Sequence, residues 1–263
     1  MAFLSHKPTR VLIIVMIILV FIGIYIAKIY YKNLNNSYDP RIIKAKVLYG
    51  KYNDFVKKND YQSVFNLLDS VEIIYDQVRH YKNSYEKGVV YNNRCAAFLS
   101  IALNLDSLKP LMILQQYANL SKDSLLNLAG KEANKSIVVY ENWLQRFDDK
   151  DEKQINETIR DVFFSGLESY EINQKEKYLK RRIKEIQTAQ YETKRRLSVS
   201  YTNLGTVYRH REAYHDAALC FKKALDLWDR NLTAENNLNI LFNKPLKKRN
   251  ILQKLFPPER KNK

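Results

Sequence analysis

The feature that most limits the fold is a pair of apolar faces with helical spacing in residues 200–225, SYTNLGTVYRHREAYHDAALCFKKAL. Tyr201, Leu204 and Tyr208 share one helical face, and Gly205 lies beside them. After the polar segment RHRE, the second face consists of Ala217, Phe221 and Ala224. A glycine inside a helix costs about 1 kcal/mol relative to alanine. Gly205 is therefore predicted to mark the closest approach of two tightly packed antiparallel helices.

This helix pair resembles a tetratricopeptide repeat (TPR), a helix–turn–helix unit of about 34 residues. A unit over residues 198–231 puts large and small residues at the signature positions of the family. These positions hold Tyr201, Leu204, Gly205, Tyr208, Tyr214, Ala217, Phe221 and Ala224. Glu212 replaces the usual turn glycine, and Asp229 replaces the usual closing proline. Because one hairpin cannot bury its apolar face alone, the resemblance implies further units.

Three weaker units resemble the same repeat, at residues 45–78, 88–147 and 160–193. In the second unit, Cys95 takes the small-residue position of a first helix, and the partner helix is displaced along the chain. Helical spacing fits more than one register over residues 105–150, so that register stays open.

The composition agrees with a helical chain, because the 263 residues include only six glycines and six prolines, while 46% are hydrophobic and 27% charged. The predicted fold class is all-α, an N-terminal transmembrane helix followed by an α-solenoid of antiparallel helix pairs. The TPR-like domain would cover residues 38–243 with about three to four units. Residues 232–242 are expected to form a helix that caps the last repeat.

Residues 11–31 are the most apolar part of the chain, and VLIIVMIILVFIGIYIA from Val11 to Ala27 carries no charge. A helix over residues 11–31 would be roughly 31 Å long, which matches the hydrocarbon core of a bilayer. A cleaved signal peptide is the alternative, but cleavage after Ala27 would put the bulky Tyr25 where a small residue is required. The segment therefore predicts a single-pass membrane anchor after a short basic tail at residues 1–10.

The side of the membrane on which the domain lies stays open. The basic residues that flank the anchor mildly favour a cytoplasmic domain, whereas a long domain is translocated largely irrespective of charge. A resemblance to bacterial membrane-anchored TPR proteins implies the inner membrane, with the C-terminal domain expected to be extracytoplasmic.

The net charge of +16 is concentrated at the two ends of the chain. Residues 1–37 contain four Lys or Arg and no acidic residue, and residues 242–263 contain eight Lys or Arg and one Glu. The residues between them have an ordinary charge balance, so a nucleic-acid partner is unlikely on this pattern. Residues 244–263 are predicted to form a basic, partly disordered tail that could contact anionic lipid or an acidic partner.

No motif for catalysis or cofactor binding is recognisable. The chain has no glycine-rich phosphate loop, no H-E-x-x-H sequence and no nucleophile elbow. Residues 148–152 lack the ligand spacing of a calcium loop and are expected to form a solvated turn before a helix. Cys95 and Cys220 are expected to be free thiols, and their redox compartment stays open. We expect no enzyme activity, no cofactor and no metal.

Candidate binding residues follow from the repeat register. Some TPR proteins hold a terminal carboxylate with Asn, Lys and Arg residues on their inner helices. Asn53 and Asn93 match two Asn positions of that arrangement, but its basic positions are not matched. Polar lining of a groove is therefore expected. In the last repeat, the residues expected to face this groove are Val199, Thr202, Thr206 and Arg209.

Two functions of different classes follow from these patterns. The first is a membrane-tethered scaffold or adaptor that binds a partner protein or peptide in the concave groove of its repeats. The resemblance implies envelope assembly factors, chaperones or secretion components as partners. In the alternative, the basic tail is the working part, and the repeats are structural.

Overall fold

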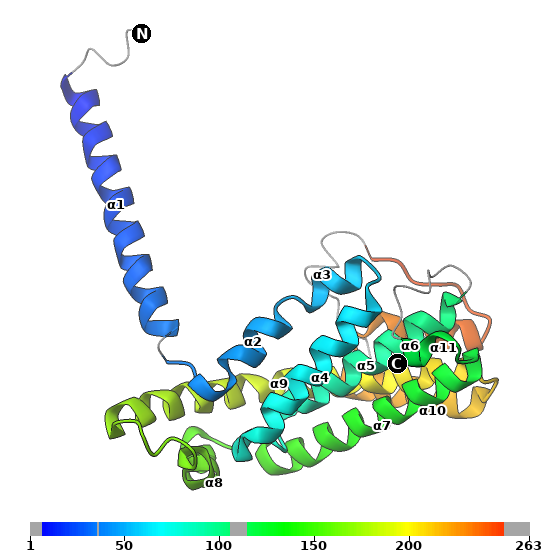
Figure 1. The fold of residues 1–263 in the computed structure, drawn as a ribbon. Helices are drawn as coiled ribbons and strands as arrows, with labels where there is room; N and C mark the ends of the chain where they lie inside the picture. The colour runs from blue at the N-terminus through cyan, green and yellow to red at the C-terminus, as the bar shows by residue number, and fades with distance from the viewer. Residues whose placement is uncertain (1–6, 36, 106–114, 250–263) are drawn as a thin grey trace.

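The computed structural model describes residues 7–35, 37–105 and 115–249. All regular secondary structure within these ranges is helical, and no strand occurs there, so the all-α prediction is confirmed. Figure 1 shows the helices in chain order: α1 (Lys7–Asn35), η2 (Pro40–Ile42), α2 (Ile43–Tyr49), α3 (Tyr52–Lys57), α4 (Tyr61–Gln77), η3 (Arg79–Tyr81), α5 (Tyr85–Leu103), α6 (Gln115–Ala118), α7 (Lys122–Phe147), α8 (Glu152–Phe164), α9 (Ile172–His210), α10 (Tyr214–Leu227) and α11 (Leu232–Leu241).

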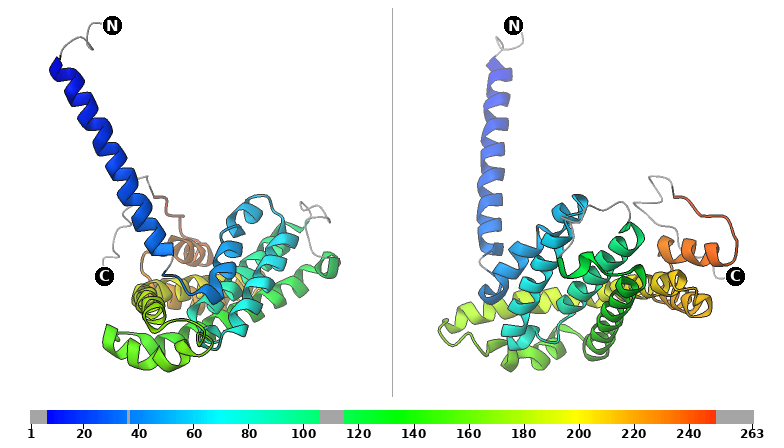
Figure 2. Two further views of the ribbon diagram at one scale, coloured as in Figure 1. Left: turned by 60° about the vertical axis from the view of Figure 1, so that its left-hand side comes forward. Right: turned by 45° about the vertical axis from the view of Figure 1, so that its right-hand side comes forward.

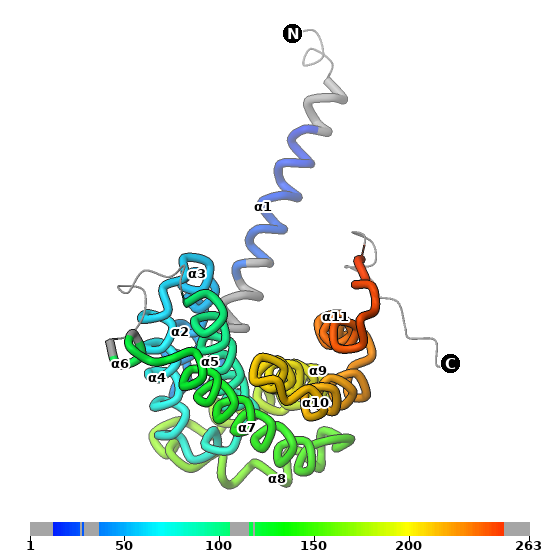
Figure 3. Tube along the Cα trace, turned by 90° about the vertical axis from the view of Figure 1, so that its right-hand side faces the viewer, coloured from blue at the N-terminus to red at the C-terminus, as the bar shows by residue number. Residues whose placement is uncertain are grey.

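Successive helices of the body pack on one another. Helix α2 packs on α4, α4 on α5, α5 on α7, α7 on α9, α9 on α10, and α10 on α11. Helix α9 also contacts α5 and α11. Figure 3 shows α2 to α5 on one side of the body, α9 to α11 on the other, and α7 and α8 below them. Helices α5 and α9 are distant in the sequence, yet they come together on the inner side of this arrangement.

The buried apolar side chains form two main clusters, and α9 contributes to both. The larger cluster joins α2, α4, α5 and α7 with the C-terminal half of α9. The second cluster joins the end of α7, α8 and the N-terminal half of α9. A helix of 39 residues is long enough to reach both clusters. Helix α9 therefore ties the two halves of the body together.

The helix boundaries agree with the predicted units in part. Helices α5 and α7 pack together along their length, as expected for the unit at 88–147. The separation between the units at 160–193 and 198–231 is wrong, because α9 runs unbroken through residues 193–198. Neither glycine nor proline occurs between residues 172 and 204, so nothing interrupts the helix there.

The solvated turn predicted at residues 148–152 is confirmed. Asp149 has a positive φ of 56° at the end of α7. Asp151 then caps α8, because its side chain accepts a hydrogen bond from the Gln154 backbone while the Gln154 side chain accepts one from the Asp151 backbone. Such a reciprocal cap satisfies two amide groups at the start of the helix.

Helix α1 extends away from the body (Figure 2). Large apolar side chains along it, from Ile13 to Ile26, are exposed. Across the described ranges, however, no helix combines the length and the apolarity that a membrane crossing requires. This finding contradicts the predicted membrane-spanning anchor at residues 11–31, and with it the single-pass inner-membrane location.

The predicted capping helix is confirmed as α11, and the first residues of the tail predicted to be partly disordered are bonded to it. Residues 244–249 have no regular secondary structure. The Asn236 side chain accepts a hydrogen bond from Lys247 N at 2.8 Å and donates one to Lys247 O at 3.0 Å. Asn239 donates to Pro245 O at 3.2 Å, and Lys247 pairs with Glu235 at 2.7 Å. Residues 250–263 lie outside the described ranges, so a lipid contact there stays a prediction.

Asn236→Ala should release this segment, because the substitution removes both hydrogen bonds to the Lys247 backbone. We expect trypsin to cleave after Lys247 and Lys248 up to about thirtyfold faster, since each of the two hydrogen bonds contributes about 1 kcal/mol. Asn134→Ala, at an exposed position on α7, is the matched control and should leave the cleavage rate unchanged. Equal rates in both variants would show that Asn236 does not hold the segment.

Candidate functional site

The last predicted repeat corresponds to the C-terminal half of α9 and to α10. Gly205 faces α10 so closely that an added Cβ atom would lie 2.6 Å from Phe221 Cε1 and 3.1 Å from Cys220 Cβ. The predicted close approach is therefore present. The other packing residues that are buried or half-buried are Tyr201, Leu204, Tyr208, Ala217 and Ala224. Tyr214 is 56% exposed, so its predicted packing role is wrong.

Thr202, predicted to line a groove, instead belongs to a buried polar network between α9 and α11. Asn231 Nδ2 donates to Thr202 Oγ1 and to Ser198 Oγ, both at 2.9 Å. The Asn231 carboxamide oxygen accepts a hydrogen bond from Ala234 N at 3.0 Å and so caps α11. Thr202 is 3% exposed and therefore unavailable to a ligand.

Two further residues predicted to line the groove form hydrogen bonds with other residues of the chain. Arg209 Nη1 donates to Asn237 Oδ1 on α11 at 2.6 Å. Thr206 donates to the Thr202 carbonyl at 2.9 Å. Val199 is half-buried. Because α11 contacts this face of α9, the groove predicted at the last repeat is not open as expected.

Asn53 and Asn93 are not brought together. Asn53 is exposed on α3, whereas Asn93 on α5 donates to the Tyr49 hydroxyl at 2.8 Å. Tyr49 also stacks on Tyr52, with ring centroids 5.7 Å apart. Asn93 therefore orients an aromatic side chain on α2.

Two cavities lie between α9 and the helices α2, α4 and α5, and they share Tyr85 and Arg196. The first measures about 250 Å³ and is lined by Tyr85, Arg181, Lys184, Glu185, Thr188, Ala189, Glu192 and Arg196. The second measures about 200 Å³ and is lined by Tyr49, Val71, Tyr75, Tyr85, Glu86, Val89, Val90 and Arg196. We call the two together the α5–α9 groove. One cavity is mainly charged, and the other is mainly apolar.

Arg196 stands where the two cavities meet. Its guanidinium lies over the Tyr85 ring, 5.2 Å from the centroid. Tyr85 in turn packs edge-on against Trp143, with ring centroids 5.3 Å apart. The Nη1 atom of Arg196 is buried and has no hydrogen-bond partner in the described part of the chain. Buried donors are nearly always paired in native proteins, so an unpaired Nη1 atom at this position is unusual.

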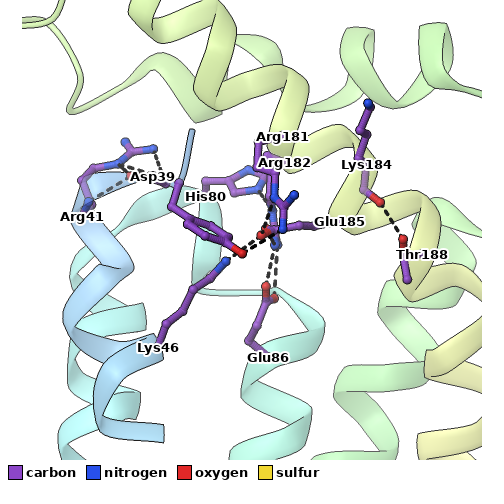
Figure 4. A network of polar contacts seen from close by, with 11 residues as sticks. Asp39, Arg41, Lys46, His80, Glu86, Arg181, Arg182, Lys184, Glu185 and Thr188 are labelled. Carbon is purple, nitrogen blue, oxygen red and sulfur yellow. Dashed lines mark hydrogen bonds and ion pairs between the residues drawn. The ribbon is translucent and has the colours of Figure 1, made fainter. Parts of the chain in front are cut away.

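A buried ionic network adjoins the α5–α9 groove, because Glu86 and Glu185 belong both to the network and to the lining of the cavities (Figure 4). Arg182 is 2% exposed and donates to Glu86 Oε2 at 3.1 Å and to His80 Nε2 at 2.9 Å. Lys46 on α2 pairs with Glu185 on α9 at 2.6 Å. Burial alone would raise the pKa of Glu86, but the charge and hydrogen bonds of Arg182 outweigh it and lower that pKa below its usual value. The network thus fixes α9 against α2 and α5.

Burial, and then the positive charges of Arg182, Arg41 and Arg146, lower the pKa of His80 well below its ordinary value of 6.5. Because His80 accepts a hydrogen bond from Arg182, the imidazole is neutral in this arrangement. The unfolded chain therefore takes up a proton near pH 6.5, while the folded chain does so only at lower pH. His80 contributes stability that is complete above pH 6.5 and is lost as the pH falls.

We expect the free energy of unfolding to decrease between pH 6.5 and 5, by up to about 1.4 kcal/mol per pH unit from this one residue. His80→Gln keeps an acceptor for Arg182 but does not titrate, so its unfolding free energy should change less over this range. Urea denaturation at a series of pH values measures the difference. A wild type and His80→Gln with the same pH dependence would contradict this assignment.

The sequence reading missed Arg182, Glu86 and Arg196. Arg182 lies beside the buried Ile183, within a stripe of core residues on α9. An arginine in such a stripe signals a buried ion pair, because an unpaired buried charge is too costly. Nothing in the local pattern identifies Glu86 as its partner, since the two residues are 96 positions apart.

Both cysteines are free thiols. Cys95 is buried in the main core, and burial raises its pKa. Cys220 is half-buried next to Gly205, and burial raises its pKa to about 11. Neither thiol ionises at neutral pH. In the part of the chain that the structure describes, no three His, Cys, Asp or Glu residues are grouped so as to hold a metal ion.

Comparison with known proteins gives no relative: no family model matches the chain, and neither a curated protein nor a solved structure matches it significantly. The interpretation of the α5–α9 groove therefore rests on its own geometry and on the repeat motif.

Proposed function

We propose that this chain is a TPR-like binding protein that holds an extended segment of a partner protein in the α5–α9 groove. The order of helix packing supports the repeat interpretation. Helix pairs α2/α4, α5/α7 and α9/α10 follow one another, with α11 at the end, as in stacked hairpins. Helix α8 and the N-terminal half of α9 would be an insertion between the second and the last pair.

The observation that carries the proposal is the pair of cavities that meet at Tyr85 and Arg196. In the repeat interpretation this would be the inner face, where the first helices of successive units converge in stacked repeats. A mainly apolar cavity beside charged groups is the usual composition of a site that binds a peptide or ligand. We propose a binding role rather than a catalytic one, because the lining residues include no nucleophile activated by a neighbouring base.

Site-specific cross-linking in the native host tests this proposal. A photo-reactive residue replaces Thr188, which is exposed and lines the charged cavity, and in a second variant it replaces Val138, which is 54% exposed on α7. We expect a discrete adduct from position 188 and none from position 138. Val89→Trp should fill the apolar cavity and abolish the adduct. The proposal fails if both positions give the same adducts, or if position 188 gives none.

A further inference from the structure

We infer that the α5–α9 groove is specific for acidic segments. Arg196 would pair with the side-chain carboxylate of an Asp or Glu in an extended peptide, and a neighbouring large apolar side chain of that peptide would fill the apolar cavity. This inference rests on the proposed function and names the ligand class of the same site.

The first argument is the unused hydrogen-bonding capacity of Arg196. Its side chain lines both cavities and has no carboxylate partner in the described part of the chain, although a guanidinium can bind a carboxylate through two parallel hydrogen bonds. Stacking on Tyr85 fixes the plane of the guanidinium. Little conformational freedom is therefore lost when a carboxylate binds.

The second argument is the balance of charge in the charged cavity. Arg181, Lys184 and Arg196 contribute three positive charges, against two carboxylates. Both carboxylates already have cationic neighbours: Glu185 pairs with Lys46 and lies 3.6 Å from Arg181, and Glu192 lies 3.7 Å from Arg195. Glu86, which lines the apolar cavity, is paired with Arg182. The remaining positive charge attracts an acidic ligand. It also disfavours the basic tail of this chain as the occupant, since residues 242–263 carry eight Lys or Arg and one Glu.

The third argument is the shape of the site. The apolar cavity of about 200 Å³ is lined by Tyr49, Val71, Tyr75, Val89 and Val90, and it has room for one large side chain. Arg196 lines both cavities, so a chain that occupies both continues past the guanidinium. This favours a carboxylate within a peptide over the carboxylate at the end of a chain.

Binding to peptide libraries tests the inference with the full-length protein. Four libraries contain acetylated and amidated nonapeptides, random except for two central residues. The central pairs are Phe-Glu, Phe-Gln, Gly-Glu and Phe-Lys, and a fifth library ends in a free Phe-Glu carboxylate. The protein is tested as wild type, Arg196→Gln and Arg196→Lys. Lys223→Gln, an exposed change of the same charge on α10, is the matched control.

We expect wild type to bind the internal Phe-Glu library at least about tenfold more tightly than the Phe-Gln and Phe-Lys libraries, as one charged hydrogen-bonded pair implies. Arg196→Gln should remove this preference, Arg196→Lys should retain part of it, and Lys223→Gln should leave it unchanged. Melting curves establish that each variant is folded. The comparison among libraries on wild type does not depend on any variant.

The other outcomes separate the two claims. Equal binding to Phe-Glu and Phe-Gln libraries that Val89→Trp abolishes would overturn the acidic specificity and leave the groove as a binding site. Stronger binding to the free-carboxylate library would also overturn the inference, in favour of chain-end recognition. Binding to none of the libraries would count against acidic specificity, and together with an absence of cross-links at position 188 it would overturn the proposed function as well.

Discussion

Gly205→Leu should lower the free energy of unfolding by about 3 kcal/mol or more. The smallest added atom, a Cβ, already lies 2.6 Å from the Phe221 ring and 3.1 Å from Cys220 Cβ. Overpacking of this kind typically costs about 1–3 kcal/mol, and a leucine adds three further carbons. Because Phe221 is fully buried, its ring cannot move aside without disturbing its neighbours.

Gly205→Ala should also be destabilising, although less so. Sequence reasoning alone would expect alanine to be tolerated, because it gains up to about 1 kcal/mol of helix propensity. The short distance to the Phe221 ring reverses that expectation. Gly88→Ala should behave in the same way, since its Cβ would lie 2.4 Å from Tyr140 Cε1.

Gly130→Ala is the matched control for these substitutions. Gly130 is also inside a helix, but its Cβ would meet Val207 Cγ1 at 3.6 Å, an ordinary contact. This variant should be neutral or more stable by up to about 1 kcal/mol. Urea denaturation of the four glycine variants measures the order of their unfolding free energies. A Gly205→Leu protein as stable as Gly130→Ala would contradict the close packing of α9 on α10.

Arg182→Met should lower the free energy of unfolding by about 3–5 kcal/mol. The substitution leaves Glu86 buried without its cation and deprives His80 of its hydrogen-bond donor. Removing one partner of a buried ion pair costs more than removing both. The double variant Arg182→Met with Glu86→Gln should therefore recover part of the loss.

Lys194→Met provides the comparison for Arg182→Met. Lys194 pairs with Asp148 at 2.7 Å, but its side chain is 43% exposed. Loss of a surface ion pair should cost less than about 1 kcal/mol. Similar losses in the Arg182 and Lys194 variants would mean that the buried network does not hold α9 against α5.

The parts of the fold that sequence reasoning predicted depend on local patterns. The spacing around Gly205 identified the α9–α10 pair, and the residues after Asn231 identified α11 as a cap. Both features follow from neighbours within one or two helical turns. The continuous α9 was missed because repeat units were expected to end near residue 193, although no helix-breaking residue occurs there.

The candidate site could not be predicted in the same way. Arg196 and Tyr85 are more than a hundred positions apart in the sequence, and periodicity does not say which distant helix faces meet. The groove-facing positions assigned from the repeat register were wrong for a related reason. Thr202 is bonded to Asn231, the N-cap of α11, and Arg209 is bonded to Asn237 on α11. The apolar composition of residues 11–31 was likewise not enough to predict a membrane anchor, since no helix in the described ranges meets the requirements for crossing a membrane.

The central claim is tested most directly by locating a bound partner segment on the full-length protein. Amide hydrogen exchange should be measured with and without the segment recovered by cross-linking at position 188. If the segment binds in the α5–α9 groove, its addition should slow amide exchange in α5 and in residues 181–196 of α9. Exchange in α10 should not change. Slower exchange in α10, with α5 and residues 181–196 unaffected, would contradict the account.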